Sequence, residues 1–238
     1  MIKTALLTIG DSAIADATIR SLAKHSALKH VVYSRKKRRV SLYRRMREYG
    51  LLYSLHALTS RILYLVSNLF DKHKSEIPNR IVWDDDMSAE DVSTQLADID
   101  LVVCCLFNMI LDRSFIQEFE YCVNIHPSSL PNYRGPEPIY WGLLNKESTF
   151  GLTLHYITER IDDGDVILQS QCNRPSIPVS FFVEHRLAST MNDLMQEFLA
   201  QVTAGDISTM KQEGGFYLPS PTLANIRKAR SGFPKETT

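Results

Sequence analysis

The chain has 238 residues, 44% of them apolar and 23% charged, which is the composition of a globular protein with one large domain. Lys plus Arg and Asp plus Glu both number 27, so the net charge indicates no particular partner. The apolar part of the N-terminus is too short for a signal peptide, and the four cysteines lack the paired spacing of a zinc site. We therefore expect a cytoplasmic protein that binds no metal.

Short apolar runs alternate with helical patterns along the chain. This alternation predicts a Rossmann-like α/β fold, in which helices flank a mostly parallel sheet. We expect strands at 2–8, 30–33, 81–83, 101–106, 122–125, 151–158 and 166–172. We expect helices from 12 to 22, at 88–96, 113–119, 138–145 and 180–202, and a short basic helix near the C-terminus. Asp163 and Gly164 are typical of a hairpin turn between the last two strands.

The α/β domain is expected to cover residues 1–175, with a helical insertion at 35–75, and a C-terminal helix and tail at 176–238 are expected to pack on it. The insertion contains eight basic residues and no acid between Arg35 and Arg47, followed by apolar runs. It is interpreted as a basic segment on a membrane or nucleic acid, as an ordinary helical hairpin broken at Gly50, or as a dimer surface or wall of an acceptor site. We favour the hairpin, so neither a membrane nor a nucleic acid is expected, and a homodimer stays open.

The first turn of the chain joins a strand to a helix through Gly10, Asp11 and Ser12. Such a turn can hold an anion at the helix N-terminus. The glycine-rich dinucleotide fingerprint and the Walker lysine are both absent, and the Asp11 carboxylate would repel a phosphate. A helix cap is therefore the favoured interpretation, and no nucleotide cofactor is expected.

Asn124 and His126 are the strongest candidates for a reactive site. They lie two residues apart near the end of a predicted strand, so their side chains point to the same side of the sheet. A carboxamide donor beside a titratable ring suits the stabilisation of a developing oxyanion. The acidic stretch 161–165 follows downstream, and its carboxylates Asp162, Asp163 and Asp165 could each orient the imidazole. His155 is interpreted as a half-buried strand residue without a catalytic role.

Residues 124–145, NIHPSSLPNYRGPEPIYWGLLN, and 151–169, GLTLHYITERIDDGDVILQ, resemble the folate-dependent formyltransferases. That family includes the glycinamide ribonucleotide, methionyl-tRNA and sugar N-formyltransferases. The resemblance implies transfer of a formyl group from N10-formyltetrahydrofolate to a primary amine. It also implies that Asn124 and His126 stabilise the oxygen of the tetrahedral intermediate, and that the family aspartate, Asp162, orients His126 and favours its charged form. Asp163 is then better explained by the turn.

The resemblance also implies where the two substrates bind. The folate donor would lie beside the strand end and loop before the motif, with one further apolar contact from the acidic stretch. The expected donor-site residues are Phe107, Asn108, Met109, Ile110, Leu111 and Ile161. The expected acceptor-site residues are Gly10, Asp11, Ser12, Pro127, Arg134 and Tyr217.

The acceptor is not fixed by the motif. The chain looks too short for the extra domain of methionyl-tRNA formyltransferases, and Asp11 replaces the phosphate loop of the purine-pathway enzyme. We therefore expect a small-molecule amine, most of all an amino sugar nucleotide. Methionyl-tRNA, an amino acid or a hydroxylamine stays open as the acceptor. A formyltetrahydrofolate hydrolase and a binding module that kept the fold are the rival functions.

Overall fold

The computed structural model describes residues 1–34, 42–70, 79–84 and 86–232. Within them, seven strands form one sheet in the order β3-β2-β1-β4-β5-β6-β7. The strands are β1 (Lys3–Thr8), β2 (Ala27–Ser34), β3 (Asn79–Trp83), β4 (Leu101–Cys105), β5 (Tyr121–His126), β6 (Thr149–Tyr156) and β7 (Val166–Asn173). The first five strands pair in parallel, and β6 and β7 continue the sheet antiparallel. The predicted mostly parallel α/β fold is confirmed.

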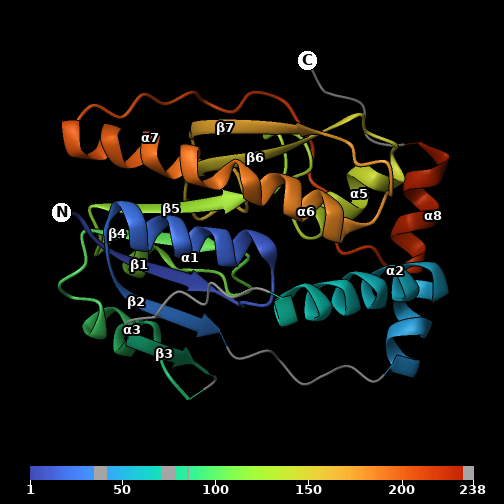
Figure 1. Cartoon of the computed structure of the whole chain (residues 1–238), viewed down its shortest axis with the longest axis horizontal. Helices are drawn as coiled ribbons and strands as arrows, with labels where there is room; N and C mark the ends of the chain where they lie inside the picture. Colours follow the sequence, from blue (N-terminus) through green and yellow to red (C-terminus); the bar gives the residue numbers. More distant parts are fainter. Residues whose placement is uncertain (35–41, 71–78, 85, 233–238) are drawn as a thin grey trace.

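Helices cover both faces of the sheet (Figure 1). They are α1 (Ala13–His25), α2 (Leu42–Phe70), α3 (Ala89–Gln95), α4 (Arg113–Gln117), α5 (Pro138–Leu144), α6 (Ser180–Ser189), α7 (Met191–Ala204) and α8 (Leu223–Ser231). One buried cluster joins the sheet to α1, α5, α6 and α7, and a second joins its other face to α3 and α4. The strands between the two layers are apolar on both sides, which explains the unbroken buried run of β4.

The long helix expected at 180–202 is two helices, so that prediction is wrong. Thr190 ends α6 with φ −90° and ψ −8°, and its amide bonds to the Leu187 carbonyl in a tightened turn. The Thr190 hydroxyl also shares a 2.7 Å hydrogen bond with the Ser170 hydroxyl of β7, which holds the junction between the helices on the sheet. The apolar spacing continues across the break because both helices pack on the same core.

The hairpin turn expected at Asp163 and Gly164 is also wrong in its details. β6 and β7 do pair antiparallel, but residues 157–165 join them, and the left-handed residue of this loop is Asp162 with φ 52°. Gly164 is required for a different reason, since a Cβ there would collide with the Tyr156 carbonyl oxygen. The wider loop brings Asp162 back over the end of β5.

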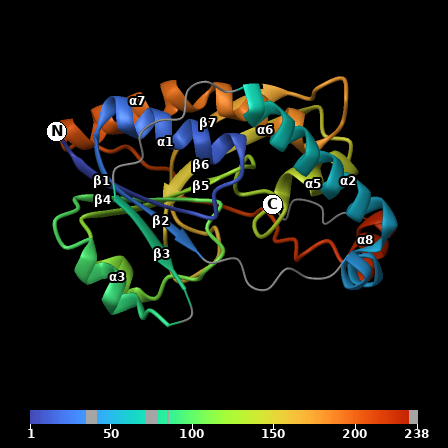
Figure 2. The ribbon, with the colours of Figure 1, turned by 60° about the horizontal axis from the view of Figure 1, so that its bottom comes forward.

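α2 is the chain's inserted helix, and it bends at Gly50 as the sequence predicts. Gly50 has φ 84°, and a Cβ at this position would collide with the Leu223 side chain of α8. Figure 2 shows α2 along the outside of the molecule, beside α6 and α8. Residues 35–41 and 71–75 of the expected insertion, including the basic block Arg35–Arg39, lie outside the described residues.

Candidate active site

The end of β5 carries the two motif residues to the carboxyl edge of the parallel strands. β6 runs antiparallel beside it, in a register that sets Asn124 opposite His155 and His126 opposite Thr153. Cross-strand neighbours of this kind lie close enough for their side chains to interact. The sheet therefore adds His155, which sequence reasoning left out, to the pair that it predicted.

Asp162 joins the three side chains from the β6–β7 loop. Its Oδ1 accepts a 3.3 Å hydrogen bond from Asn124 Nδ2, and its Oδ2 accepts a 2.9 Å bond from the Gly135 amide. The same Oδ2 lies 3.5 Å from His126 Nδ1, and Oδ1 lies 3.8 Å from His155 Nε2. Of the three carboxylates that the sequence left open, Asp162 is therefore the one that meets the imidazole.

His155 orients the amide of Asn124. It is 2% exposed, and burial lowers its pKa to about 4, so the ring is neutral at physiological pH. Nδ1 lies 2.8 Å from the Tyr156 carbonyl oxygen and must donate to it, which leaves the lone pair on Nε2. That lone pair faces Asn124 Nδ2 at 3.1 Å and accepts a hydrogen bond from it. His155 is therefore fully buried and not half-buried as expected, and it lines the cavity.

His126 is held from both ring nitrogens. Nε2 lies 2.9 Å from the Tyr133 carbonyl oxygen and donates to it, while Nδ1 faces Asp162. The ring is only 5% exposed, so these contacts fix its plane. Nδ1 is thus the ring nitrogen that faces the carboxylate.

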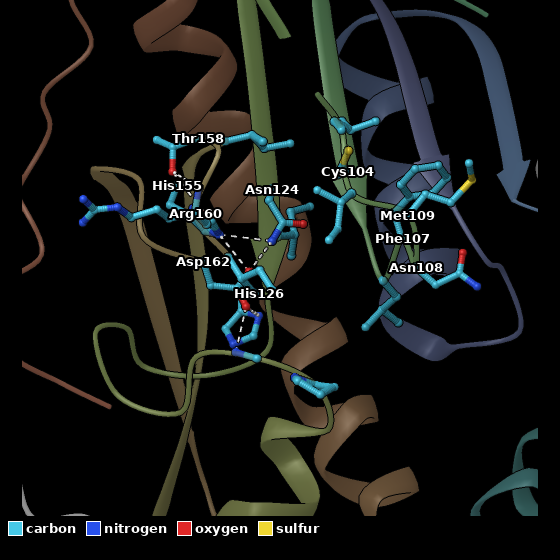
Figure 3. Close-up of a pocket in the computed structure, with 18 of the residues that line it drawn as sticks. Cys104, Phe107, Asn108, Met109, Asn124, His126, His155, Thr158, Arg160 and Asp162 are labelled. Atoms are coloured by element: carbon cyan, nitrogen blue, oxygen red, sulfur yellow. Dashed lines mark hydrogen bonds and ion pairs between the residues drawn. The ribbon is translucent and has the colours of Figure 1, made fainter. Parts of the chain in front are cut away.

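A cavity of about 360 Å³ opens between these residues and the end of β4. In Figure 3, Asn124, His126 and Asp162 lie on one side and Phe107, Asn108 and Met109 on the other. Every residue expected in the donor site lines it, namely Phe107, Asn108, Met109, Ile110, Leu111 and Ile161. Leu106 turns the chain out of β4 with φ 52° and so presents the loop 107–111 to the cavity. Ile110 is 81% exposed at the rim, although it is aliphatic.

The expected acceptor residues divide into two groups. Pro127 lines the cavity, but Gly10, Asp11, Ser12, Arg134 and Tyr217 do not. Arg134 pairs with Asp163 at 2.9 Å, and its backbone bridges to Tyr217, so these two residues support the loop behind His126. The structure therefore brings only part of the expected set to the cavity.

The first turn forms the expected helix cap and is filled by carboxylates. Ser12 accepts from the Ile14 amide at the start of α1, and its hydroxyl donates to Glu184 at 2.8 Å. Burial raises the pKa of Glu184 to about 7. Asp11 forms a 2.9 Å ion pair with Arg61 of α2. These contacts place side chains where a turn of this kind could otherwise hold an anion.

Glu137 is a further cavity residue that sequence reasoning missed. It caps α5 in the left-handed region with φ 61°, and it lines the cavity beside Pro136 and Pro138. Tyr53 of α2 donates a 2.9 Å hydrogen bond to its carboxylate. The sequence does show a charged residue between two prolines of the motif, which could have drawn attention to Glu137. Its hydrogen-bond partner Tyr53 lies in the distant insertion, and residue spacing does not predict that contact.

No metal site was found among the described residues, because no cluster of His, Cys, Asp and Glu in them has a suitable arrangement. Cys104 borders the cavity but is buried, and burial raises the pKa of its thiol well above the ordinary value. A thiol of this kind is neutral and a poor ligand or nucleophile. The polar side chains that converge at the end of β5 are the Asn124 amide, the imidazoles of His126 and His155, and the Asp162 carboxylate.

Comparison with known proteins places this site in a family context. The family model described as formyl transferase matches residues 61–194, which include every side chain of the cluster. A curated relative, methionyl-tRNA formyltransferase of Borrelia duttonii, is 33% identical over 115 residues, covering 48% of this chain and 37% of the relative. The chain thus spans well under half the length of the curated relatives that it matches.

Solved structures show the same fold at lower identity. A sugar N-formyltransferase from Shewanella has a TM-score of 0.62 and 20% identity, covering 92% of this chain and 77% of its own. HypX from Aquifex aeolicus in complex with tetrahydrofolic acid has a TM-score of 0.59 and 15% identity, covering 91% of this chain and 29% of its own. At these identities, the likeness establishes the fold.

Proposed function

Because this chain belongs to the formyl transferase family, we propose that it transfers a formyl group from N10-formyltetrahydrofolate to a primary amine of a small molecule. An amino sugar carried by a nucleotide is the acceptor that we favour. The convergence of Asn124, His126 and Asp162 at the mouth of one cavity carries the proposal, with Asp162 within 3.5 Å of both partners. We assign these three residues as catalytic.

The donor, when bound, supplies a formamide carbon that the amine attacks. Charge then develops on the formyl oxygen, and we assign the Asn124 amide, a neutral donor in the cavity wall, to stabilise it. Its contact with Asp162 is long, at 3.3 Å, and is the contact that it can exchange for the substrate oxygen. A single donor of this kind contributes about 2.7–4 kcal/mol to the transition state.

His126 and Asp162 are assigned to the proton transfers of the reaction. Asp162 stabilises a proton on His126 Nδ1, and this proton can pass to the leaving nitrogen of the donor as the carbon–nitrogen bond breaks. The attacking amine must lose a proton in the same cycle, and we assign Asp162 to accept it, directly or through one water. His155 remains neutral throughout and keeps the Asn124 amide turned toward the reaction.

The cavity fits the ring end of the donor. A volume of about 360 Å³ lies within the usual range for small-molecule pockets of about 300–1,000 Å³. Apolar side chains at 107–111 would enclose a flat ring, while backbone groups of this loop are free of sheet hydrogen bonds and can pair with its edge. The exposed Ile110 and Ile161 form the rim over which the rest of the donor would extend.

The charges near the cavity argue against an acceptor that is held by a phosphate at the first turn. Glu137 and Glu159 line the cavity, and Asp11 and Glu184 occupy the first turn. These carboxylates disfavour a phosphate held at the first turn and favour a protonated or hydroxyl-rich acceptor. Methionyl-tRNA is the second candidate, since curated relatives carry that name and match about half of this chain.

The test is a transfer assay with the purified chain, N10-formyltetrahydrofolate and a panel of amines. The panel contains amino sugar nucleotides, free amino sugars, amino acids and methionyl-tRNA, and mass spectrometry detects a product heavier by one formyl group less a hydrogen. Production of formate at the same rate with and without amine would instead identify a hydrolase. Donor binding without any turnover across the panel would contradict the proposal.

A further inference from the structure

The helix α2 packs on the protein through tyrosines and polar side chains, while a row of its aliphatic side chains faces solvent, which is unusual for aliphatic residues. Four of its inward side chains make hydrogen bonds or ion pairs with the body. These pairs are Tyr53 with Glu137, His56 with Ser180, Arg61 with Asp11 and Tyr64 with Asp16, at 2.7–2.9 Å. Tyr53, with Tyr49 and Ala57, also packs in a small buried cluster beside Tyr140 and Trp141, so α2 is attached to the body without its exposed aliphatic residues.

The outward side of α2 carries a continuous aliphatic stripe. Its members recur at three- and four-residue spacing and are between 46% and 81% exposed. They are Leu51, Leu52, Leu55, Leu58, Ile62, Leu65, Val66 and Leu69. A contiguous exposed patch of this kind, in contrast to scattered single residues, marks an interaction surface. The expected ordinary hairpin does not account for it.

The charges at one end of the stripe are mostly basic. Within Leu42–Phe70, the sequence of α2 contains four arginines and one acid, Glu48, which pairs with Arg44 at 2.8 Å. Arg47 is exposed in the same turn region of α2. α8 packs against α2 and adds exposed Arg227, Lys228 and Arg230. The aliphatic stripe thus begins at a strongly basic end.

We propose that α2 docks this protein on an anionic lipid surface, lying in the plane of the bilayer with the aliphatic stripe among the acyl chains. An aliphatic face with basic residues beside it is the pattern of interfacial helices, and clusters of basic residues on such helices bind acidic headgroups. Among the described residues, no helix is both long and apolar enough to cross a bilayer, so the helix lies on the surface. A second copy of α2 would cover the stripe but would bring no acidic partner for its basic end.

Co-sedimentation of the full chain with vesicles tests this docking. We expect binding to phosphatidylglycerol–phosphatidylcholine vesicles, weaker binding to phosphatidylcholine alone, and loss of binding as salt increases. The double change Leu55→Glu with Ile62→Glu should weaken binding more than about tenfold, because it places two charges in the acyl region. Met210→Glu, on a side chain that is 62% exposed away from α2, is the matched control and should bind like the wild type.

A second variant separates charge from apolar contact. Arg44→Ser with Arg47→Ser should weaken binding to anionic vesicles about tenfold or more and leave binding to phosphatidylcholine unchanged. Far-UV circular dichroism and the melting midpoint verify that each variant is folded. The proposal is overturned if the wild type stays in the supernatant with anionic vesicles. It is also overturned if the Leu55/Ile62 variant binds these vesicles as well as the wild type does. A lipid-free dimer that this variant dissociates, with no vesicle binding, would identify a second copy as the occupant.

Discussion

Asp162→Asn separates the charge of this side chain from its shape. Asp162 sits in the left-handed region with φ 52°, which Asn adopts as readily as Asp, so the loop backbone is expected to persist. The two carboxylate oxygens accept from two donors, the Gly135 amide at 2.9 Å and Asn124 Nδ2 at 3.3 Å. An amide offers only one oxygen, so one of the two donors must face an NH2 group.

The shorter bond decides which donor is lost. The Gly135 amide is fixed by the backbone and keeps the oxygen, so the new NH2 group faces Asn124 and turns its amide away from His155. The donor expected to meet the substrate oxygen is then misplaced, and His126 loses the carboxylate beside Nδ1. We expect kcat to fall about 10²–10⁴-fold, the range of a lost general acid–base group. The free energy of unfolding should fall by about 1–3 kcal/mol for a buried donor without a partner.

The assay measures kcat at saturating donor and amine, and urea denaturation measures stability. Asp163→Asn is the matched control one residue away, because Asp163 pairs with Arg134 and Arg160 near the surface. Both side chains of the Arg134–Asp163 pair are partly buried, so the control can lose some stability, but Asp163 does not line the cavity and the control should keep nearly the full rate. The reasoning is refuted if Asp162→Asn and Asp163→Asn have the same kcat.

Three further outcomes are expected. His126→Ala should lower kcat more than about 100-fold with little change in melting midpoint, and a near wild-type rate at saturating acceptor would rule out its role. His155→Phe should lower kcat without weakening donor binding measured by fluorescence, because Asn124 loses the acceptor that orients it; an equal loss of affinity would point to general unfolding of the site. Burial raises the pKa of Glu184 to about 7 in the folded chain, so the wild type should lose up to about 3 kcal/mol of stability as pH rises from about 4.5 to 7. Glu184→Gln should remove this pH dependence, which urea titrations at several pH values measure.

The sign of the Glu184 effect follows from its surroundings. Burial disfavours the charged form, so the unfolded chain releases this proton at lower pH than the folded chain does. Its contribution to stability is therefore fully present below the unfolded pKa and is lost as pH rises through the folded pKa. A flat wild-type profile between these two values, with Glu184→Gln identical to it, would contradict the assignment.

The sequence predicted those parts of the molecule that depend on local pattern. The two-residue spacing of Asn124 and His126 placed both beside Asp162, and Gly50 marked the bend of α2 because no other residue fits φ 84° against Leu223. Strand positions followed from apolar runs, since a strand buried on both faces has little choice of composition.

Features that depend on pairing across the fold were out of reach. His155 enters the site only through the register of β6 on β5, which periodicity does not encode. The break at Thr190 was hidden because α6 and α7 bury apolar residues against one core, so the helical spacing runs on. The outward direction of the α2 stripe was hidden as well, because an amphipathic pattern does not say which side faces the protein.

The bend of α2 also connects the C-terminal helix α8 to the cavity wall. Leu223 of α8 packs against Gly50 at that bend. A small buried cluster, separate from the two clusters on the sheet, contains Tyr53, Trp141 and Leu218. Tyr53 in turn holds Glu137 in the cavity wall. Residues 216–232 therefore support the cavity wall that contains Glu137, and we expect a truncation before residue 214 to alter substrate preference.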